Sequence, residues 1–467
     1  MRRLIFCLVL LAGCSSNVNG SPGGEEDPGD GAEVSDDDST DVGPGDGDGG
    51  STDESTILSD LTIETPTTLA IGEALVVTAR LTNARSADTT VVWSIGRGEQ
   101  LEYAAVSSSS FGGELPVGDA TLVIPTGELV ASSTLATGTA GLAEALALSL
   151  SFSADGGTTV RSLAITPRAT DIKDIAATAY HGRVLRHDGV VLTAQGCPSA
   201  AGTALTHEDL PPLARIATGG LGLLFAQSTD DVLLAMVTET LQITDDGHVV
   251  DVDAVTDPDA AQIVGMRESY YEAYLSYADG TLKRMTPGGV ATLVATSPRH
   301  VGLPMLEAFA LTADAAGVVT LTPSPFFPYD SNSIPQPYAT WPDLRAFDGL
   351  HAVVLAVRGN GDLIAIESLV NPDDAPGPFP NHTVTRTAFV PDATNVVEVK
   401  LSFSRTFVRW ANGDVRWING AGNVSGFSTA TLSSEEPQRF SHPPVRTVGC
   451  YLSHYCALLV GNTIECL

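Results

Sequence analysis

The feature that most constrains this chain is a repeat that begins near residue 171 and continues to residue 467. Each unit contains an apolar strand, a small residue, a second apolar strand, a tight turn and a third strand. Seven units fill this region, and each is about 42 residues long, which is the size of a propeller blade. One such unit cannot bury its own two faces, so neighbouring units must stack, and closing the ring removes most exposed strand edges. The repeat therefore predicts a seven-bladed β-propeller.

The turns of this repeat carry the residues that hairpin turns need. Asp-Gly or Asn-Gly pairs supply positive φ angles at several of them. The expected turns lie near residues 189, 231, 280, 317, 361, 413 and 461.

The last unit has the most complete motif, Val445-x-x-Val448, then His454, Ala457-Leu458 and Gly461. This motif resembles the repeats of the regulator of chromosome condensation family. Departures are large, because only the first and third units keep Asp-Gly and no unit keeps the closing Trp-Gly. The resemblance implies that residues 168–467 form a propeller like that family's, used as a rigid scaffold for partner binding. The resemblance does not imply that this chain acts in guanine-nucleotide exchange, as some members of that family do, because the expected compartment is different.

Residues 57–167 alternate between apolar and polar side chains, as in Leu75, Val77, Ala79 and Leu81. Period-two segments broken by Gly, Asp and Asn, with no convincing helix, predict a β-sandwich of about 100 residues. The segment Ala70-Ile71-Gly72-Glu73 and the later Val92-Trp93-Ser94 resemble bacterial Ig-like domains. That resemblance makes Trp93 a central packing residue. The expected fold class is therefore all-β, an Ig-like sandwich followed by a propeller.

The first fourteen residues look like an export signal. Arg2 and Arg3 precede an apolar run that is too short to span a bilayer, which predicts a signal peptide over residues 1–13. The ending Leu11-Ala12-Gly13-Cys14 resembles the lipobox of bacterial lipoproteins. It implies a diacylglycerol anchor on Cys14 and a location in the cell envelope. Ser15 favours the outer membrane, and the sequence leaves open whether the protein faces the periplasm or the outside.

Residues 14–56 predict an acidic, disordered tether. Between Ser15 and Thr56 there are 13 acidic residues and no Lys or Arg, and such a stretch cannot bury enough apolar surface to fold. A solvated spacer is favoured over a calcium site, because no segment matches the twelve-residue calcium loop. The whole chain carries a formal charge of −32, which argues against nucleic acid as a partner.

Four cysteines remain after the signal and the lipidated residue are set aside, and an exported chain favours disulfides. Cys456 and Cys466 flank one predicted hairpin, where they would lie opposite each other. Cys197 and Cys450 would then join the first and last blades and latch the ring. A metal site formed by the last three cysteines, with His454, is the alternative, and it is disfavoured in an oxidising compartment without Cys-x-x-Cys spacing.

Loop aromatic residues are the candidate binding patch, with close packing of the loop onto a blade as the alternative. They are Phe326, Phe327, Tyr329, Tyr338 and Trp341. Three histidines, His181, His351 and His454, recur near one repeat position, which indicates a framework role. His187 precedes a turn and is expected to be exposed to solvent.

The sequence contains none of the usual nucleophile, zinc or phosphate-loop motifs, so neither a catalytic residue nor a cofactor is assigned. The favoured function is a lipid-anchored, monomeric scaffold that binds a protein or glycan. Two alternatives stay open. One is an envelope hydrolase or lyase that uses loop carboxylates, and the other is a purely structural component.

Overall fold

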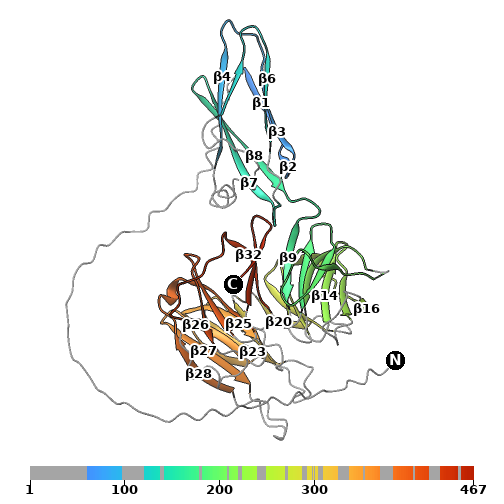
Figure 1. The fold of residues 1–467 in the computed structure, drawn as a ribbon, viewed down its shortest axis with the longest axis vertical. Coiled ribbons are helices and arrows are strands. Elements are labelled where there is room, and N and C mark those ends of the chain that lie inside the picture. The colour runs from blue at the N-terminus through green and yellow to red at the C-terminus, as the bar shows by residue number, and fades with distance from the viewer. Residues whose placement is uncertain are drawn as a thin grey trace, which may run out of the picture. The chain divides into compact units, whose positions relative to one another are not determined.

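The computed structural model describes two β units, a sandwich over Leu61–Thr166 and a ring of sheets over Ile172–Cys466 (Figure 1). The described residues are 60–96, 120–136, 141–177, 181–207, 210–218, 223–238, 249–268, 272–286, 292–296, 298, 300–302, 309–323, 336–350, 353–368, 382–402, 405–419, 432–450 and 454–467. Within them, helix is limited to the short 3-10 turns η1 (Ala260–Gln262) and η2 (Ala393–Asn395). A helix of the length and apolarity needed to cross a membrane is not found in this described part.

The sandwich has two sheets that share one core. One sheet has the order β1-β3-β6, and the other has the order β2-β8-β7-β4-β5. Trp93 is 2 % exposed and stacks on Phe152 with ring centroids 6.1 Å apart, which confirms its predicted place in the core. The sandwich strands are β1 (Leu61–Glu64), β2 (Thr68–Ala70), β3 (Ala74–Leu81), β4 (Thr89–Gly96), β5 (Ala120–Ile124), β6 (Val130–Ala136), β7 (Leu146–Ala154) and β8 (Gly157–Thr166).

Seven separate antiparallel sheets follow, which confirms the predicted seven-bladed propeller. Blades 1 to 3 contain β9 (Ile172–Ala177), β10 (His181–Arg186), β11 (Val191–Gln195) and β12 (Thr203–Ala204); β13 (Leu213–Thr218), β14 (Leu223–Ser228), β15 (Leu233–Thr238) and β16 (Val249–Val255); and β17 (Ile263–Glu268), β18 (Ala273–Tyr277), β19 (Thr281–Met285) and β20 (Thr292–Thr296).

Blades 4 and 5 also have four strands, whereas three strands are described in each of blades 6 and 7. They contain β21 (His300–Gly302), β22 (Phe309–Ala313), β23 (Val318–Pro323) and β24 (Gln336–Thr340); β25 (Leu344–Leu350), β26 (Val353–Arg358), β27 (Asp362–Ser368) and β28 (His382–Phe389); β29 (Val396–Leu401), β30 (Arg405–Trp410) and β31 (Val415–Asn419); and β32 (Pro444–Cys450), β33 (His454–Leu459) and β34 (Ile464–Cys466).

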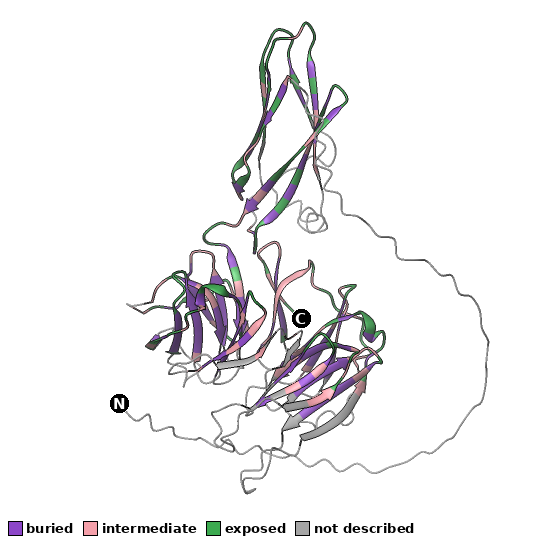
Figure 2. Ribbon diagram, turned by 180° about the vertical axis from the view of Figure 1, so that it is seen from behind, coloured by how far each residue is buried: buried purple, intermediate pink, exposed green. Residues whose placement is uncertain are grey.

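The first strands of neighbouring blades lie next to each other from blade 7 through blades 1 and 2 to blade 3, and from blade 4 through blades 5 and 6 to blade 7. Strand β9 contacts both β13 of blade 2 and β32 of blade 7, so the last blade meets the first. Buried residues concentrate on the blade strands (Figure 2), and apolar clusters join residues of adjacent blades. The blades of these pairs therefore bury their faces against one another, as the repeat requires.

Each predicted turn position carries a residue with positive φ, most often glycine. In blade 2 this residue is Asp231 (φ 61°), and in blade 7 it is Asn462 (φ 62°) rather than the adjacent Gly461. Asn and Asp tolerate this region better than other residues with a Cβ. The turn glycines are Gly189, Gly280, Gly317, Gly361 and Gly413. We call the end of the blades that carries these turns the turn end.

One bulge recurs near the start of the first strand in six blades. There, one residue is skipped in the pairing with the second strand, which re-aims its side chain away from the ladder. Because each first strand begins beside the turn of its own blade, the skipped residues lie at the turn end. They are Lys173, Ala214, Val264, Arg345, Val397 and Val445.

Candidate functional site at the ring closure

Among the described strands, none is shared between the first and last blades where the ring closes. Blade 1 is built from β9 to β12, and blade 7 is built from β32 to β34. Side chains and loops must therefore hold the two blades together.

Asn462 forms one of these connections at the turn end. Its Oδ1 accepts a hydrogen bond from the Ile172 backbone N–H (3.0 Å), and its Nδ2 donates to the Ile172 carbonyl (2.8 Å). The amide thus copies the pairing that a neighbouring strand would make with β9. Its position at a left-handed turn also explains why asparagine suits the site.

Replacing Asn462 with glycine should lower the free energy of unfolding by about 2 kcal/mol, because two hydrogen bonds are lost while the turn conformation is kept. Chemical denaturation measures the loss. Asn412→Gly is the matched control in the blade 6 turn, where the amide bonds to the nearby Asp414 instead. Equal losses in the two variants would contradict the role of Asn462 in closure.

A segment of the sandwich, residues 141–143, covers the same junction. The Leu142 N–H donates to Asp171 Oδ2 (3.1 Å), and the Ala143 N–H donates to the Val460 carbonyl (3.2 Å). Both Leu142 and Ala143 are buried. The segment therefore binds the start of blade 1 and the turn of blade 7 at once.

His187 belongs to this junction, and its predicted solvent exposure is wrong. It is half-buried, and its Nε2 donates to the Ala143 carbonyl (2.9 Å). The sequence did not reveal this contact because the acceptor lies 44 residues away in the sandwich.

Asp171 is the charged group of the junction. Burial alone would raise its pKa, but hydrogen bonds from the Arg168 side chain, the Arg168 backbone N–H and the Leu142 N–H lower it below the ordinary value of 3.8. Asp171 therefore stays ionised at neutral pH and accepts all these bonds.

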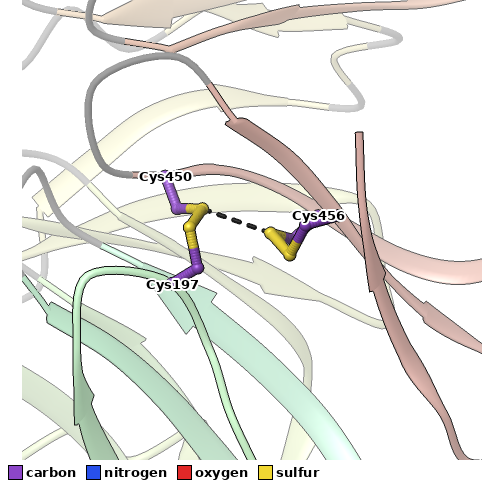
Figure 3. Close-up of side chains that lie close together, drawn as sticks. Cys197, Cys450 and Cys456 are labelled. Carbon is purple, nitrogen blue, oxygen red and sulfur yellow. Dashed lines mark hydrogen bonds between the residues drawn. A yellow bond between two sulfur atoms is a disulfide. The ribbon is translucent and has the colours of Figure 1, made fainter.

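The four cysteines meet at another point of the closure, and Figure 3 labels three of them, Cys197, Cys450 and Cys456. One disulfide joins Cys197 to Cys450 across blades 1 and 7, with Cα atoms 5.4 Å apart, and another joins the paired positions Cys456 and Cys466. All four sulfurs lie within 4.8 Å of one another, and the Cys450 and Cys456 sulfurs are 3.2 Å apart. Paired in this way, they have no thiolate to offer a metal ion.

Ion pairs between first strands add to the closure. Arg446 of blade 7 pairs with Asp174 of blade 1 (Nε to Oδ1, 3.4 Å) and donates from Nη2 to the Met266 carbonyl of blade 3 (3.3 Å). Arg446 therefore connects three blades. Sequence reasoning missed it because the partners lie 180 or more positions away.

Glu398 joins blades 6 and 7. Its Oε2 accepts from Arg409 Nη2 (2.9 Å) and from the Tyr455 hydroxyl (2.6 Å), and its Oε1 accepts from the Thr447 hydroxyl. Burial would raise its pKa, but Lys400, Arg409 and the two hydroxyl donors hold it below the ordinary value of 4.5.

The lowered pKa of Glu398 predicts a pH dependence of stability. Because folding favours the ionised form, its contribution is complete above pH 4.5 and is lost as the pH falls through the lower folded-state pKa. Glu398→Gln should be about 2 kcal/mol less stable than the wild type at pH 7, with a smaller difference in acid, as measured by denaturation at several pH values. The exposed Glu64, paired with Arg80, provides the control, and Glu64→Gln should change stability by less than about 0.5 kcal/mol.

The predicted aromatic patch is only partly within the described residues. Tyr338 and Trp341 contact each other edge to face (centroids 6.3 Å apart) and pack against the cluster shared by blades 4 and 5. These two residues therefore pack onto the blades, which was the alternative to a binding patch. Phe326, Phe327 and Tyr329 lie outside the described residues.

The recurring histidines occupy different surroundings. His181 is 8 % exposed at the start of β10, whereas His454, at the same place in β33, is exposed. His351 lies outside the described residues.

Comparisons with known proteins give a limited result. No protein-family model and no curated protein matches this chain. Similar solved structures include Kap60 bound to yeast RCC1 (Prp20), at 12% identity and a TM-score of 0.38, covering 61% of this chain and 79% of that one. Another is Sqt1 from Chaetomium thermophilum, at 11% identity and a TM-score of 0.36, covering 68% and 89%. Sqt1 bound to the N-terminus of ribosomal protein L10 gives a TM-score of 0.35 at the same identity and coverage.

Proposed function

We propose that this chain is a lipid-anchored protein of the bacterial cell envelope whose propeller binds another protein. The signal and lipobox pattern that ends at Cys14 supports the anchor, and residues 14–56 would form an acidic tether. Both segments lie outside the described residues. Ser15 favours an outer-membrane location. The propeller would act as a monomeric scaffold like those of the chromosome-condensation regulators.

The sandwich would be an Ig-like stalk between the tether and the propeller. Its sheet order supports this assignment. The order β1-β3-β6 in one sheet and β8-β7-β4 in the other matches the arrangement of strands A, B, E and G, F, C in Ig-like sandwiches.

One observation carries the binding proposal, namely large apolar side chains exposed at the turn end. Val264 and Val397 are bulge residues, 59 % and 47 % exposed. Phe389 (58 % exposed) pairs with Asp362 beside the blade 5 turn, and Val232 (42 %) follows the blade 2 turn. These are four of the five exposed large apolar residues in the described propeller. They come from four different blades, and exposed apolar groups that share one end of a domain favour an interaction surface there.

The chemistry of these side chains favours a protein over a glycan. Branched aliphatic side chains match the apolar centre of a protein interface. A sugar is usually held by exposed aromatic faces, and the described aromatic residues of the predicted patch, Tyr338 and Trp341, already pack on the blades.

No specific observation favours the hydrolase alternative. The carboxylates Asp174, Asp348 and Glu398 on the described first strands are paired with Arg446, Lys400 and Arg409. A general acid must change protonation near neutral pH, and the pKa of Glu398 is shifted downward instead.

The test compares the full chain with two variants, each also carrying Cys14→Ser to prevent lipidation. One variant is Val264→Ser/Phe389→Ser/Val397→Ser at the turn end. The matched control is Val76→Ser/Val160→Ser, which changes exposed valines of the sandwich. Each is incubated with envelope extract, cross-linked and analysed by quantitative mass spectrometry.

A partner protein should be captured equally by the wild type and the sandwich variant. Its capture by the turn-end variant should fall about tenfold or more, since three exposed apolar contacts together contribute more than 1.4 kcal/mol. A partner captured equally by all three proteins, or no partner enriched by the wild type, would refute the proposed surface.

A further inference from the structure

The four cysteine sulfurs form a chain that runs from the surface into the core and out again. Cys466 is exposed, Cys456 and Cys450 are buried, and Cys197 is half-buried. Disulfides join the two outer pairs, and a sulfur–sulfur contact of 3.2 Å joins Cys456 to Cys450 in the middle (Figure 3). The local disulfide of the last hairpin is thus in contact with the disulfide that closes the ring.

We propose that Cys466 is a thiol-modification site, and that its reaction with a small-molecule thiol opens the Cys197–Cys450 disulfide by relay. Cys466 offers the exposed end of the chain, whereas its partner Cys456 is 0 % exposed. An external thiolate therefore attacks the sulfur of Cys466 rather than that of Cys456.

The relay consists of two thiol–disulfide exchanges. In the first, the external thiolate forms a mixed disulfide with Cys466, the Cys466–Cys456 bond breaks, and Cys456 leaves as a thiolate. In the second, the Cys456 thiolate attacks the sulfur of Cys450, a Cys450–Cys456 disulfide forms, and Cys197 leaves as a thiolate. Water then protonates Cys197. One external thiol is consumed and no other oxidant or reductant is needed.

Burial sets the direction of the second exchange. Cys456 and Cys450 lie in the apolar cluster that joins blades 1 and 7, and apolar surroundings disfavour a thiolate. Transfer to the half-buried Cys197 moves the negative charge closer to water. The 3.2 Å contact already places the attacking sulfur beside its target.

The relay would convert a modification at the surface into loss of the disulfide cross-link between the described parts of blades 1 and 7. Asn462 and the residues 141–143 would still hold the blades together through hydrogen bonds. A small thiol could thus loosen the ring without unfolding it.

The experiment exposes the full-length oxidised chain, carrying Cys14→Ser, to glutathione for a series of times. Free thiols are then alkylated in acid, and disulfides are mapped by mass spectrometry without reduction. The expected product has glutathione on Cys466, a Cys450–Cys456 disulfide and alkylated Cys197. Glutathione on Cys466 with free Cys456 and an intact Cys197–Cys450 bond would overturn the relay, and so would an adduct on Cys197 or Cys450.

Cys456→Ser/Cys466→Ser is the control, because it removes the relay and keeps the ring disulfide. Alkylation of Cys197 in this variant should be slower than in the wild type by about tenfold or more, since the exposed entry point is gone. Equal rates would mean that glutathione attacks the ring disulfide directly. If the variant does not fold, the wild-type product map alone decides between the relay and direct attack.

Discussion

Replacing Cys197 and Cys450 together with serine should lower the free energy of unfolding by about 5 kcal/mol. The bond links residues 253 positions apart, so it restricts the unfolded chain more than any local crosslink could. Denaturant titration under non-reducing conditions measures the change.

The second disulfide provides the matched comparison. Cys456 and Cys466 are separated by 10 positions, so Cys456→Ser/Cys466→Ser should cost about 3 kcal/mol. A larger loss from this local pair than from Cys197–Cys450 would contradict the view that the ring disulfide acts by closing a long loop.

Gly317→Ala should destabilise the propeller by about 3 kcal/mol or more. Gly317 has a φ of 76°, and an added Cβ would overlap the backbone of Trp341 and Pro342 in the connection to blade 5. The overlap is with backbone atoms, which cannot rotate away as the end of a side chain could. Thermal or chemical denaturation measures the loss.

Gly413→Ala separates the strain from the overlap. Gly413 has a φ of 88° in the equivalent turn of blade 6, and nothing lies within 4 Å of its added Cβ. Only the backbone strain remains, so we expect a loss of about 1 kcal/mol. Similar losses for the two glycines would show that the connection to blade 5 does not press on Gly317.

Local sequence chemistry was sufficient to predict the blades. The turn signals at Gly189, Gly280, Gly361 and Gly413 mark hairpins directly, because positive φ is a property of one residue and its neighbours. Seven such turns at blade spacing fixed the number of units. The alternation of Leu75, Val77, Ala79 and Leu81 likewise reports one buried face of a strand.

The closure was harder to predict because its parts are distant in the sequence. Asn462 and Arg446 are ordinary surface-type residues, and only the ring brings them to Ile172 and Asp174. The bulges escaped notice because skipping one residue leaves no mark in an apolar pattern. In the sequence, Val264 and Val397 look like any other apolar residue of a strand, although both are exposed.

One repeated sequence pattern marks the connection that leads into the first strand of a blade. Three connections share the pattern Pro-x-Ala-(Thr/Ala)-(Asp/Gln/Asn)-(Ile/Val), beginning at Pro167, Pro258 and Pro391. In each, the residue before the first strand accepts a backbone hydrogen bond from the turn of the same blade. The donors are the backbone N–H groups of His187, Ala278 and Ala411, at 3.0, 2.9 and 2.8 Å.

The described first and last blades share no strand, and this has a consequence for how the molecule is made. Every residue that blade 7 contributes to sealing the ring comes after the other six blades in the chain. During synthesis from the N-terminus, and during export if the chain is secreted, those six blades emerge as an open arc with two unprotected faces. Assembly must therefore wait for the last blade, and the arc is the stage at which a chaperone would be needed most.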